Sequence, residues 1–248
     1  MRAPIILTLL ITIFCSGTMV AAPKIILKLD DFQAGKGNCL CLPTMDYLIQ
    51  KQIKAGFGAV ANRFDSTALL LLKPYLNATN SKGEKLFEIW HHGLDHKRPE
   101  FAMTSYDYQK VHFEEAKQLI QNYLGIRMHS FGTPYNASDS ITNRVIAEDP
   151  DYKVFMYSSV RPAATSGIFY MDNRINMENG TGNPEFEYFV ANYNKLNSRY
   201  TDYITLQGHP NQWTPEKLEQ FKKIVDFLIV EGCEFVLPYE YYKITATR

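Results

Sequence analysis

The sequence predicts an α/β fold built on a mainly parallel sheet, either open or closed into a barrel. Short apolar runs typical of buried strands alternate with helical segments through almost the whole chain. Residues 23–248 suffice for one barrel-sized domain and are few for two domains that each have a core. We therefore expect a single domain, with active residues on the loops that follow the strands' C-terminal ends.

The first 22 residues are typical of a secretory signal peptide. Met1-Arg2 supplies a positive start, residues 5–15 are apolar, and small residues at 20–22 precede the expected cleavage point. The apolar run is short for a membrane span, although an uncleaved anchor or a lipidated Cys15 is an alternative. We expect export to the periplasm or the cell exterior, with no stable membrane insertion after cleavage.

The first strand is predicted at residues 24–29, a branched apolar run that ends in Asp30-Asp31. Residues 43–55 place apolar side chains at helical spacing, and Gly56 is positioned to end this helix. A strand at 57–64, a helix at 66–75 capped by Ser66, and a strand at 87–90 follow.

The second half continues the alternation. Residues 106–123, followed by Gly125, predict a long helix. The remaining elements are strands at 127–131, 152–157, 203–206 and 234–237 and helices at 139–147 and 214–231. Residues 161–197 are rich in Asn, Gly and Tyr, and we expect them to form an irregular excursion over the site.

The charge balance and the cysteines exclude two kinds of protein. Twenty-six basic and 26 acidic residues leave no general field that would recruit nucleic acid or an anionic membrane. An odd count of three cysteines in residues 23–248 argues against a disulfide framework. Cys39 and Cys41 are too close to bridge without strain, Cys233 could pair with either, and a three-cysteine metal site is a further alternative.

Three polar clusters follow predicted strands, at 30–31, 91–96 and 207–210. His92 and His96 are four residues apart, so on a helix both imidazoles would face one cation. Two imidazoles and one carboxylate leave positions open for water and a substrate oxygen. We therefore expect Asp31, His92 and His96 to hold a divalent metal, with zinc the best match, although His91 could replace His92.

The two neighbouring aspartates can serve one site only where the chain bends. Adjacent strand residues point to opposite faces, and we expect the bend within residues 32–37. One carboxylate, Asp31, would then bind metal, while Asp30 stays free to accept a proton.

In their order along the chain, these clusters resemble the motifs of the polysaccharide deacetylases of carbohydrate esterase family four. Leu29-Asp30-Asp31-Phe32 is similar to the family's Thr-Phe-Asp-Asp, in which the first Asp is the catalytic base and the second binds metal. Residues 88–96 resemble the second motif, a strand leading into His-x-x-x-His, and residues 131–136 resemble an aromatic-Arg-x-Pro-Tyr turn that walls the groove. Residues 206–209 are similar to the last motif, whose His is the general acid.

The resemblance implies a distorted (β/α) barrel of about seven parallel strands and a divalent metal, often zinc. It implies hydrolysis of N- or O-linked acetyl groups from a carbohydrate, with Asp30 as base and His209 as acid. Tyr135, Asn136 and Trp213 are the expected substrate-binding residues, and Trp90 is a second candidate for stacking on a sugar.

The chain also departs from the family pattern. Gly132 stands where the family has an Arg that pairs with the catalytic Asp, so we expect Lys28 or Arg127 to supply that cation. Residues 151–157 occupy the place of the fourth motif, which supports the acid His, without its acidic pattern. Two alternatives therefore stay open: a non-catalytic, metal-containing glycan-binding barrel of the cell envelope, and a hydrolase of a non-acetyl amide or ester.

Overall fold

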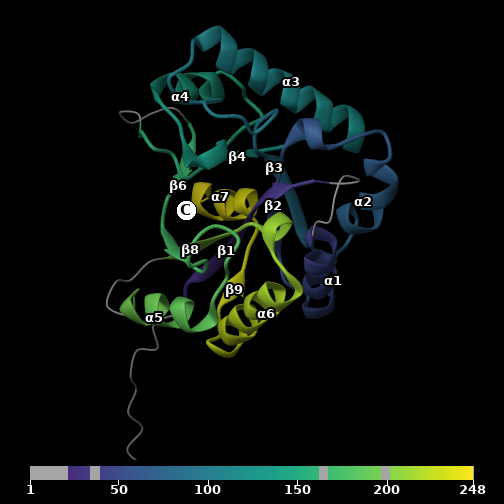
Figure 1. Ribbon diagram of the computed structural model, residues 1–248, viewed down its shortest axis with the longest axis vertical. Coiled ribbons are helices and arrows are strands. Elements are labelled where there is room, and N and C mark those ends of the chain that lie inside the picture. The colour runs from purple at the N-terminus through teal and green to yellow at the C-terminus, as the bar shows by residue number, and fades with distance from the viewer. Residues whose placement is uncertain (1–21, 34–39, 162–166, 197–201, 248) are drawn as a thin grey trace, which may run out of the picture.

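The computed structural model describes residues 22–33, 40–161, 167–196 and 202–247. Residues 1–21 of the predicted signal peptide and Cys39 lie outside these ranges. A curved parallel sheet forms the centre of the molecule, with helices packed around it (Figure 1). Its strands are β1 (Lys24–Phe32), β2 (Ala55–Ala59), β3 (Phe87–His91), β4 (Ser130–Phe131), β5 (Val154–Met156), β6 (Phe169–Met171), β7 (Arg174–Asn176), β8 (Tyr203–Gly208) and β9 (Glu234–Phe235).

The sheet is an incomplete barrel. Its strand order is β6-β5-β4-β3-β2-β1-β8-β7, β9 pairs with β1, and every pairing between these strands is parallel. The two ends of the path, β6 and β7, are consecutive in sequence, and in the described residues the barrel is open between them. The distorted barrel is confirmed, but the sheet has nine strands instead of about seven, because β6 and β7 come from the segment expected to be irregular.

Seven α-helices are present in the described ranges. They are α1 (Cys41–Lys51), α2 (Ala68–Leu76), α3 (Tyr106–Leu124), α4 (Ser140–Ala147), α5 (Phe186–Leu196), α6 (Pro215–Val230) and α7 (Pro238–Ala246), with 3₁₀ turns η1 (Ala61–Arg63), η2 (Pro134–Asn136) and η3 (Pro210–Gln212). Ser105, Asp139 and Thr214 cap α3, α4 and α6 by accepting backbone N–H groups. None of these helices combines the length and the apolar character that crossing a membrane requires.

Several predicted boundaries and elements are wrong. Helix α1 ends at Lys51, and Gly56 lies inside β2, where a Cβ atom would come within 3.1 Å of the Trp90 ring. Gly56 therefore serves close packing and does not end a helix. Ser66 does not cap α2, which begins at Ala68, and both α5 and α7 are additional to the predicted helices.

Cys41 is disulfide-bonded and Cys233 is a buried free thiol, which excludes a disulfide between Cys233 and either of the other two cysteines.

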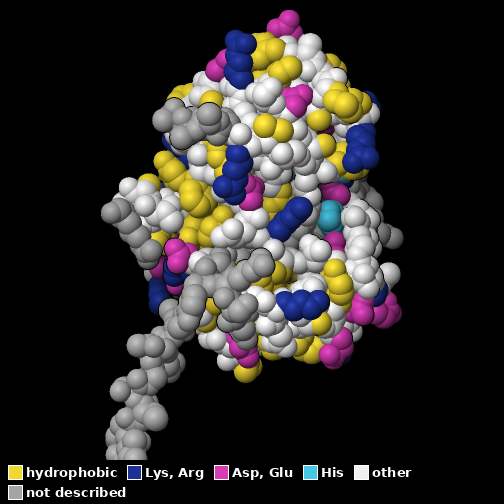
Figure 2. All heavy atoms as spheres, turned by 90° about the vertical axis from the view of Figure 1, so that its left-hand side faces the viewer, with side chains coloured by type: hydrophobic (Ala, Val, Ile, Leu, Met, Phe, Trp, Pro, Cys, Tyr) yellow, Lys and Arg dark blue, Asp and Glu magenta, His cyan; other side chains and the backbone are white. Residues whose placement is uncertain are grey.

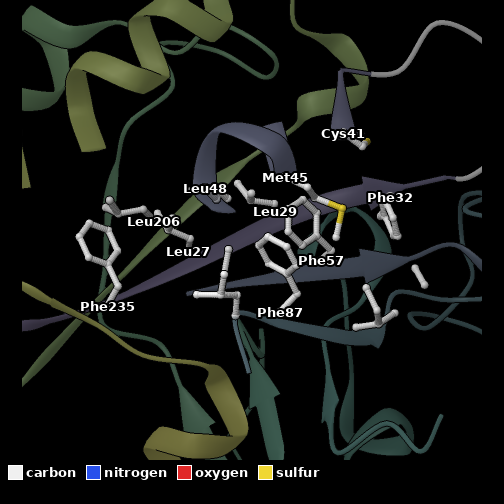
Figure 3. Packing of buried hydrophobic residues seen from close by; sticks show 14 of the residues in the cluster. Leu27, Leu29, Phe32, Cys41, Met45, Leu48, Phe57, Phe87, Leu206 and Phe235 are labelled. Atoms are coloured by element: carbon white, nitrogen blue, oxygen red, sulfur yellow. The ribbon is translucent and has the colours of Figure 1, made fainter. Parts of the chain in front are cut away.

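The period of two along β1 separates two cores. Leu27 and Leu29 point outward and pack beneath α1 with Met45, Leu48 and neighbouring apolar side chains (Figure 3). The alternate residues of β1 face the barrel interior. There Ile26 joins a second cluster with Trp90, Val154, Met156, Met171, Tyr203, Val236 and Tyr241. Lys28 and Asp30, the next inward positions, carry the interior face of β1 toward the strand's C-terminal end.

The face on the left-hand side of Figure 1 shows no dominant charge. Basic and acidic side chains are interspersed on it and form no large patch of one sign (Figure 2). This distribution agrees with the balanced composition of 26 basic and 26 acidic residues.

The buried carboxyl group of Glu88, on β3, is expected to make the protein's stability depend on pH. Its carboxylate accepts hydrogen bonds from Ser130 Oγ at 2.5 Å and from the Tyr239 N–H at 2.9 Å. Burial nevertheless raises the pKa of Glu88 from 4.5 to about 7. Because the folded protein then binds this proton more tightly than the unfolded chain, stability falls as the pH rises from 4.5 to 7.

We expect Glu88→Gln to be more stable than the wild type at pH 8 and no different at pH 4.5. A glutamine can still accept the Tyr239 N–H and can donate to Ser130, but it carries no buried charge. Since the side chain keeps some exposure, we expect a gain of about 1–2 kcal/mol at pH 8. Urea unfolding followed by circular dichroism at both pH values measures the difference, and an equal difference at the two values would contradict the prediction.

Candidate active site

The two aspartates after β1 reach one site because the chain bends at Asp31. The register of β1 against β2 shifts between Leu29 and Phe32, and Asp31 adopts a left-handed backbone with φ 59°. This shift interrupts the alternation that would send neighbouring side chains to opposite faces. The bend thus lies at Asp31 itself and not within the 32–37 segment where we expected it. Asp30 and Asp31 are both buried at the C-terminal edge of the sheet.

Asp31, His92 and His96 form a cluster that fits a divalent cation. Asp31 Oδ1 lies 3.6 Å from His92 Nε2, close to the ~3.4 Å that separates ligands around tetrahedral zinc, and 2.7 Å from His96 Nε2, which is a hydrogen-bonding distance. The donor atoms of all three residues lie within 4.8 Å of one another. Asp31 Oδ1 is buried and has no well-aligned hydrogen-bond donor, although the Arg63 guanidinium lies 3.8 Å away, so this oxygen is available to a cation.

The two imidazoles are held with the Nε2 atoms toward Asp31. His92 Nδ1 lies 2.7 Å from the Gly132 carbonyl, which can only accept, so Nδ1 carries the proton and Nε2 keeps its lone pair. His96 stands on a loop, not on the expected helix, and has a left-handed backbone with φ 58°. The Tyr135 ring lies 4.6 Å from the His96 ring, and its hydroxyl donates to the His96 carbonyl.

His91 is part of the core and does not compete with His92. It is 1% exposed and stacks on Phe113 with 4.7 Å between ring centroids. Its Nε2 lies 3.0 Å from the Phe113 carbonyl, and its Nδ1 accepts the Gly93 N–H at 3.1 Å. Because both ring nitrogens are engaged, the geometry favours His92 as the ligand.

Lys28 supplies the cation beside Asp30. Its Nζ lies 2.7 Å and 2.6 Å from the two Asp30 carboxylate oxygens, and both side chains are buried. Burial raises the pKa of Asp30, but the charge and hydrogen bond of Lys28, together with the nearby His92 and His209, outweigh it, and the net pKa is lowered. The other candidate, Arg127, is 71% exposed and lies near Asp151 instead.

Gly132 makes the space for this pair. A Cβ atom at Gly132 would lie 3.0 Å from the Trp90 ring and 3.4 Å from Lys28 Cε. The rings of Trp90 and Tyr157 each lie 4.9 Å from Lys28 Nζ and favour its charge through cation–π contact. Lys28 and Trp90 therefore fill the volume that a long side chain at residue 132 would need.

Gln207 belongs to the polar cluster at 207–210, but we assigned it no role from the sequence. Its Nε2 donates to Asp30 Oδ2 at 2.6 Å, and its Oε1 accepts from Asn136 Nδ2 at 3.1 Å. Register against β1 places Gln207 opposite Lys28, which points the amide into the barrel beside the carboxylate. Asn136 therefore contacts the site through Gln207 while remaining partly exposed.

His209 follows β8 and is oriented by Glu178, a residue that the sequence did not reveal. Glu178 Oε2 lies 2.6 Å from His209 Nδ1, and Glu178 Oε1 accepts the His209 backbone N–H and the Trp213 indole N–H. Burial lowers the pKa of His209, but the bond to Glu178 and the charge of Asp30 outweigh it, and the net pKa is raised. His209 Nε2 is left 3.9 Å from Asp30 Oδ2. The acidic residue that supports His209 therefore lies in the 161–197 segment and not in residues 151–157, the place of the family's fourth motif.

The aromatic candidates separate into buried and exposed rings. Trp213 is 6% exposed, with its ring against Phe221, and Trp90 is fully buried, so neither presents a free face to a sugar. Their positions favour structural roles. Tyr135 is 47% exposed beside His96, and Arg98 lies over its ring at 4.7 Å. Of the three candidates, Tyr135 alone keeps a largely exposed ring.

Comparison with known proteins supports the fold. No protein-family model and no curated protein sequence matches the chain. A family 4 acetyl xylan esterase from Clostridium thermocellum, solved with a cobalt ion, superposes with a TM-score of 0.64 at 19% identity, covering 90% of this chain and 92% of that one. The Xyl-CE4 domain of a xylanase from the hindgut metagenome of Trinervitermes trinervoides gives 0.64 at 17%, covering 91% and 92%.

A third similar structure carries a different description. A CE4 family pseudoenzyme from Bacillus anthracis superposes with a TM-score of 0.56 at 13% identity, covering 88% of this chain and 64% of that chain. All three likenesses extend over most of the chain. The protein therefore has a CE4 polysaccharide deacetylase-like fold.

Proposed function

We propose that the protein is an exported, metal-dependent hydrolase that removes N- or O-linked acetyl groups from a carbohydrate. The observation that carries this proposal is the convergence of three metal-type donors, a separate charge-paired carboxylate and a Glu-supported histidine at one edge of the sheet. The CE4 enzymes with a similar fold support it. Export rests on the N-terminal sequence pattern.

Asp31, His92 and His96 would hold the divalent cation, and zinc suits their one oxygen and two nitrogen donors. When bound, such an ion supplies Lewis acidity, which polarises an acyl carbonyl and makes water a better nucleophile at neutral pH. The protein's own contribution is orientation: the Gly132 carbonyl holds His92, and Tyr135 contacts His96.

Asp30 and His209 would move protons on the two sides of the acyl carbon. Asp30, kept ionised by Lys28 and oriented by Gln207, accepts a proton from the attacking water. His209 donates a proton to the departing amine or alcohol. Its raised pKa favours the protonated form, and the bond from Nδ1 to Glu178 leaves Nε2 directed toward the site.

The substrate would lie against Tyr135 and Asn136. Both residues belong to η2 and have left-handed backbones, with φ 59° and 52°. This conformation presents the Tyr135 ring outward beside the metal ligands while Asn136 turns back to Gln207. A sugar in contact with the exposed part of Tyr135 would therefore place a neighbouring acyl group near the proposed ligand His96.

The proposal predicts chelator-sensitive acetate release. Purified protein is incubated with acetylated chitooligosaccharides and with acetylated xylan, and acetate is assayed with and without a chelator. We expect release that drops at least about 100-fold on chelation and returns when zinc or cobalt is added back. No acetate from a broad panel of acetylated sugars, with metal bound, would contradict the deacetylase.

Because one protein with a similar fold is described as a pseudoenzyme, a non-catalytic function is a second candidate. A barrel that holds its metal and binds glycan without turnover would share every feature of this fold. Saturable glycan binding without acetate release would support it. A product screen by mass spectrometry on the same samples would detect a hydrolase of a non-acetyl amide or ester.

A further inference from the structure

Glu100 lies beneath the loop that carries the metal-type histidine His96. Its side chain is 1% exposed, and its two carboxylate oxygens accept separate backbone N–H groups of that loop. Oε1 accepts from Leu94 N at 2.5 Å, and Oε2 accepts from His96 N at 3.0 Å. The carboxylate therefore spans the backbone on both sides of Asp95.

The loop needs such an anchor because it has no regular structure of its own. Gly93 and His96 both have left-handed backbones, with φ 85° and 58°. The left-handed conformation costs a residue other than glycine on the order of 1 kcal/mol, and it persists only where neighbouring groups hold it. No helical hydrogen bond fixes His96, so the bond from its N–H to Glu100 is a direct restraint on this residue.

Glu100 is itself closely packed. A Cβ atom at Gly93 would come 2.8 Å from Glu100 Oε1, so the loop backbone rests directly on the carboxylate. On the other side, His112 of α3 places its buried Nδ1 3.6 Å from the same oxygen. The long helix α3 and the ligand loop thus meet at one buried carboxylate.

We propose that Glu100 is a positioning residue for the metal site, acting through the backbone of His96 and not as a ligand. This inference rests on the proposed metal-dependent function. Groups that orient metal ligands change metal affinity by about 10–100-fold when they are removed. Glu100 would act in this way by fixing the direction in which the His96 imidazole leaves the loop.

The test is metal affinity in Glu100→Gln, measured by zinc competition with a chromophoric chelator and by the visible spectrum of the cobalt form. The amide has one acceptor oxygen, so one of the two backbone N–H groups loses its partner. We expect zinc binding to weaken about 10–100-fold and the cobalt bands to change, with activity largely restored at saturating metal.

Asp139→Asn is the matched control. Asp139 also accepts backbone N–H groups, from Met103 and Ile141, but it caps α4 and touches none of the three proposed ligands. We expect both variants to lose stability and only Glu100→Gln to lose metal affinity. Equal zinc affinity in wild type and Glu100→Gln, or an equal loss of zinc affinity in Asp139→Asn, would overturn this inference and leave the proposed function standing.

Two further measurements keep the outcomes separate. A wild-type protein that binds neither zinc nor cobalt would refute the proposed function and this inference together. Should Glu100→Gln fail to fold, amide exchange in the wild-type protein decides. The inference requires slowed exchange at Leu94 and His96, and rapid exchange at both would overturn it.

Discussion

Asp30→Asn is expected to lower kcat by about 10²–10⁴-fold while zinc content stays at the wild-type level. The amide cannot accept a proton from water, so the step assigned to Asp30 is lost. The proposed ligands Asp31, His92 and His96 are unchanged, and Gln207 can still contact the side chain at residue 30. Steady-state kinetics with metal analysis of the same preparations measures both quantities.

A double variant separates chemistry from folding. Asp30→Asn alone leaves Lys28 buried without its carboxylate, which lowers stability whatever the role of Asp30 in catalysis. Lys28→Met/Asp30→Asn removes both charges, and we expect it to recover much of the lost stability but none of the lost kcat. Activity that recovers along with stability would show that Asp30 is structural and not the base.

Local patterns predicted most of the framework correctly. The strand predicted at 24–29 and the helices predicted at 106–123, 139–147 and 214–231 depend on short-range chemistry, and each is present in the structure, whereas the one cap that we predicted, Ser66, is wrong. Glycine was less informative, because it serves two purposes. Gly125 ends α3 in a left-handed turn, whereas Gly56 only avoids a clash with Trp90 inside a strand.

The site was predictable in its residue types but not in its loops. His92 and His96 do lie together, yet they converge through a left-handed loop and not through helical spacing. Glu178 supports His209 from an isolated bridge with Pro184, 31 residues before the histidine, and no periodicity marks such a contact. Gln207 was detectable in principle, because strand pairing places it opposite Lys28, but only after the β1–β8 register is known.

The packing inside the barrel explains why the cation beside Asp30 is carried by residue 28 and not by residue 132. Gly132 carries no side chain, and Lys28 and Trp90 take the volume next to it. A strand residue two positions before the carboxylate can reach the carboxylate from the same face. Because the Lys28–Asp30 pair is buried, water cannot take the place of the Lys28 charge, and the pair depends on that charge.

Lys28→Met is expected to destabilise the protein by about 3–5 kcal/mol at neutral pH. It leaves Asp30 buried, with Gln207 but without the ammonium that contacts both of its oxygens, and His209 Nε2 stays 3.9 Å away. In the wild type the pKa of Asp30 is lowered, so its contribution to stability is present at neutral pH and is lost as the pH falls through that pKa. The variant removes the largest cause that lowers this pKa, so the pKa of Asp30 should be higher than in the wild type. The stability gap between the two proteins should therefore widen with rising pH.

The same change should alter catalysis. A base with a raised pKa is ionised only at higher pH, so the acidic limb of the kcat/KM profile of Lys28→Met should move upward. Lys54→Met is the matched control, because Lys54 is also buried and pairs with Glu84 and Glu240, away from Asp30. We expect it to lose stability without any movement of that limb. An unchanged profile in Lys28→Met would show that Lys28 does not replace the missing arginine, since solvation or Gln207 would then suffice to keep Asp30 ionised.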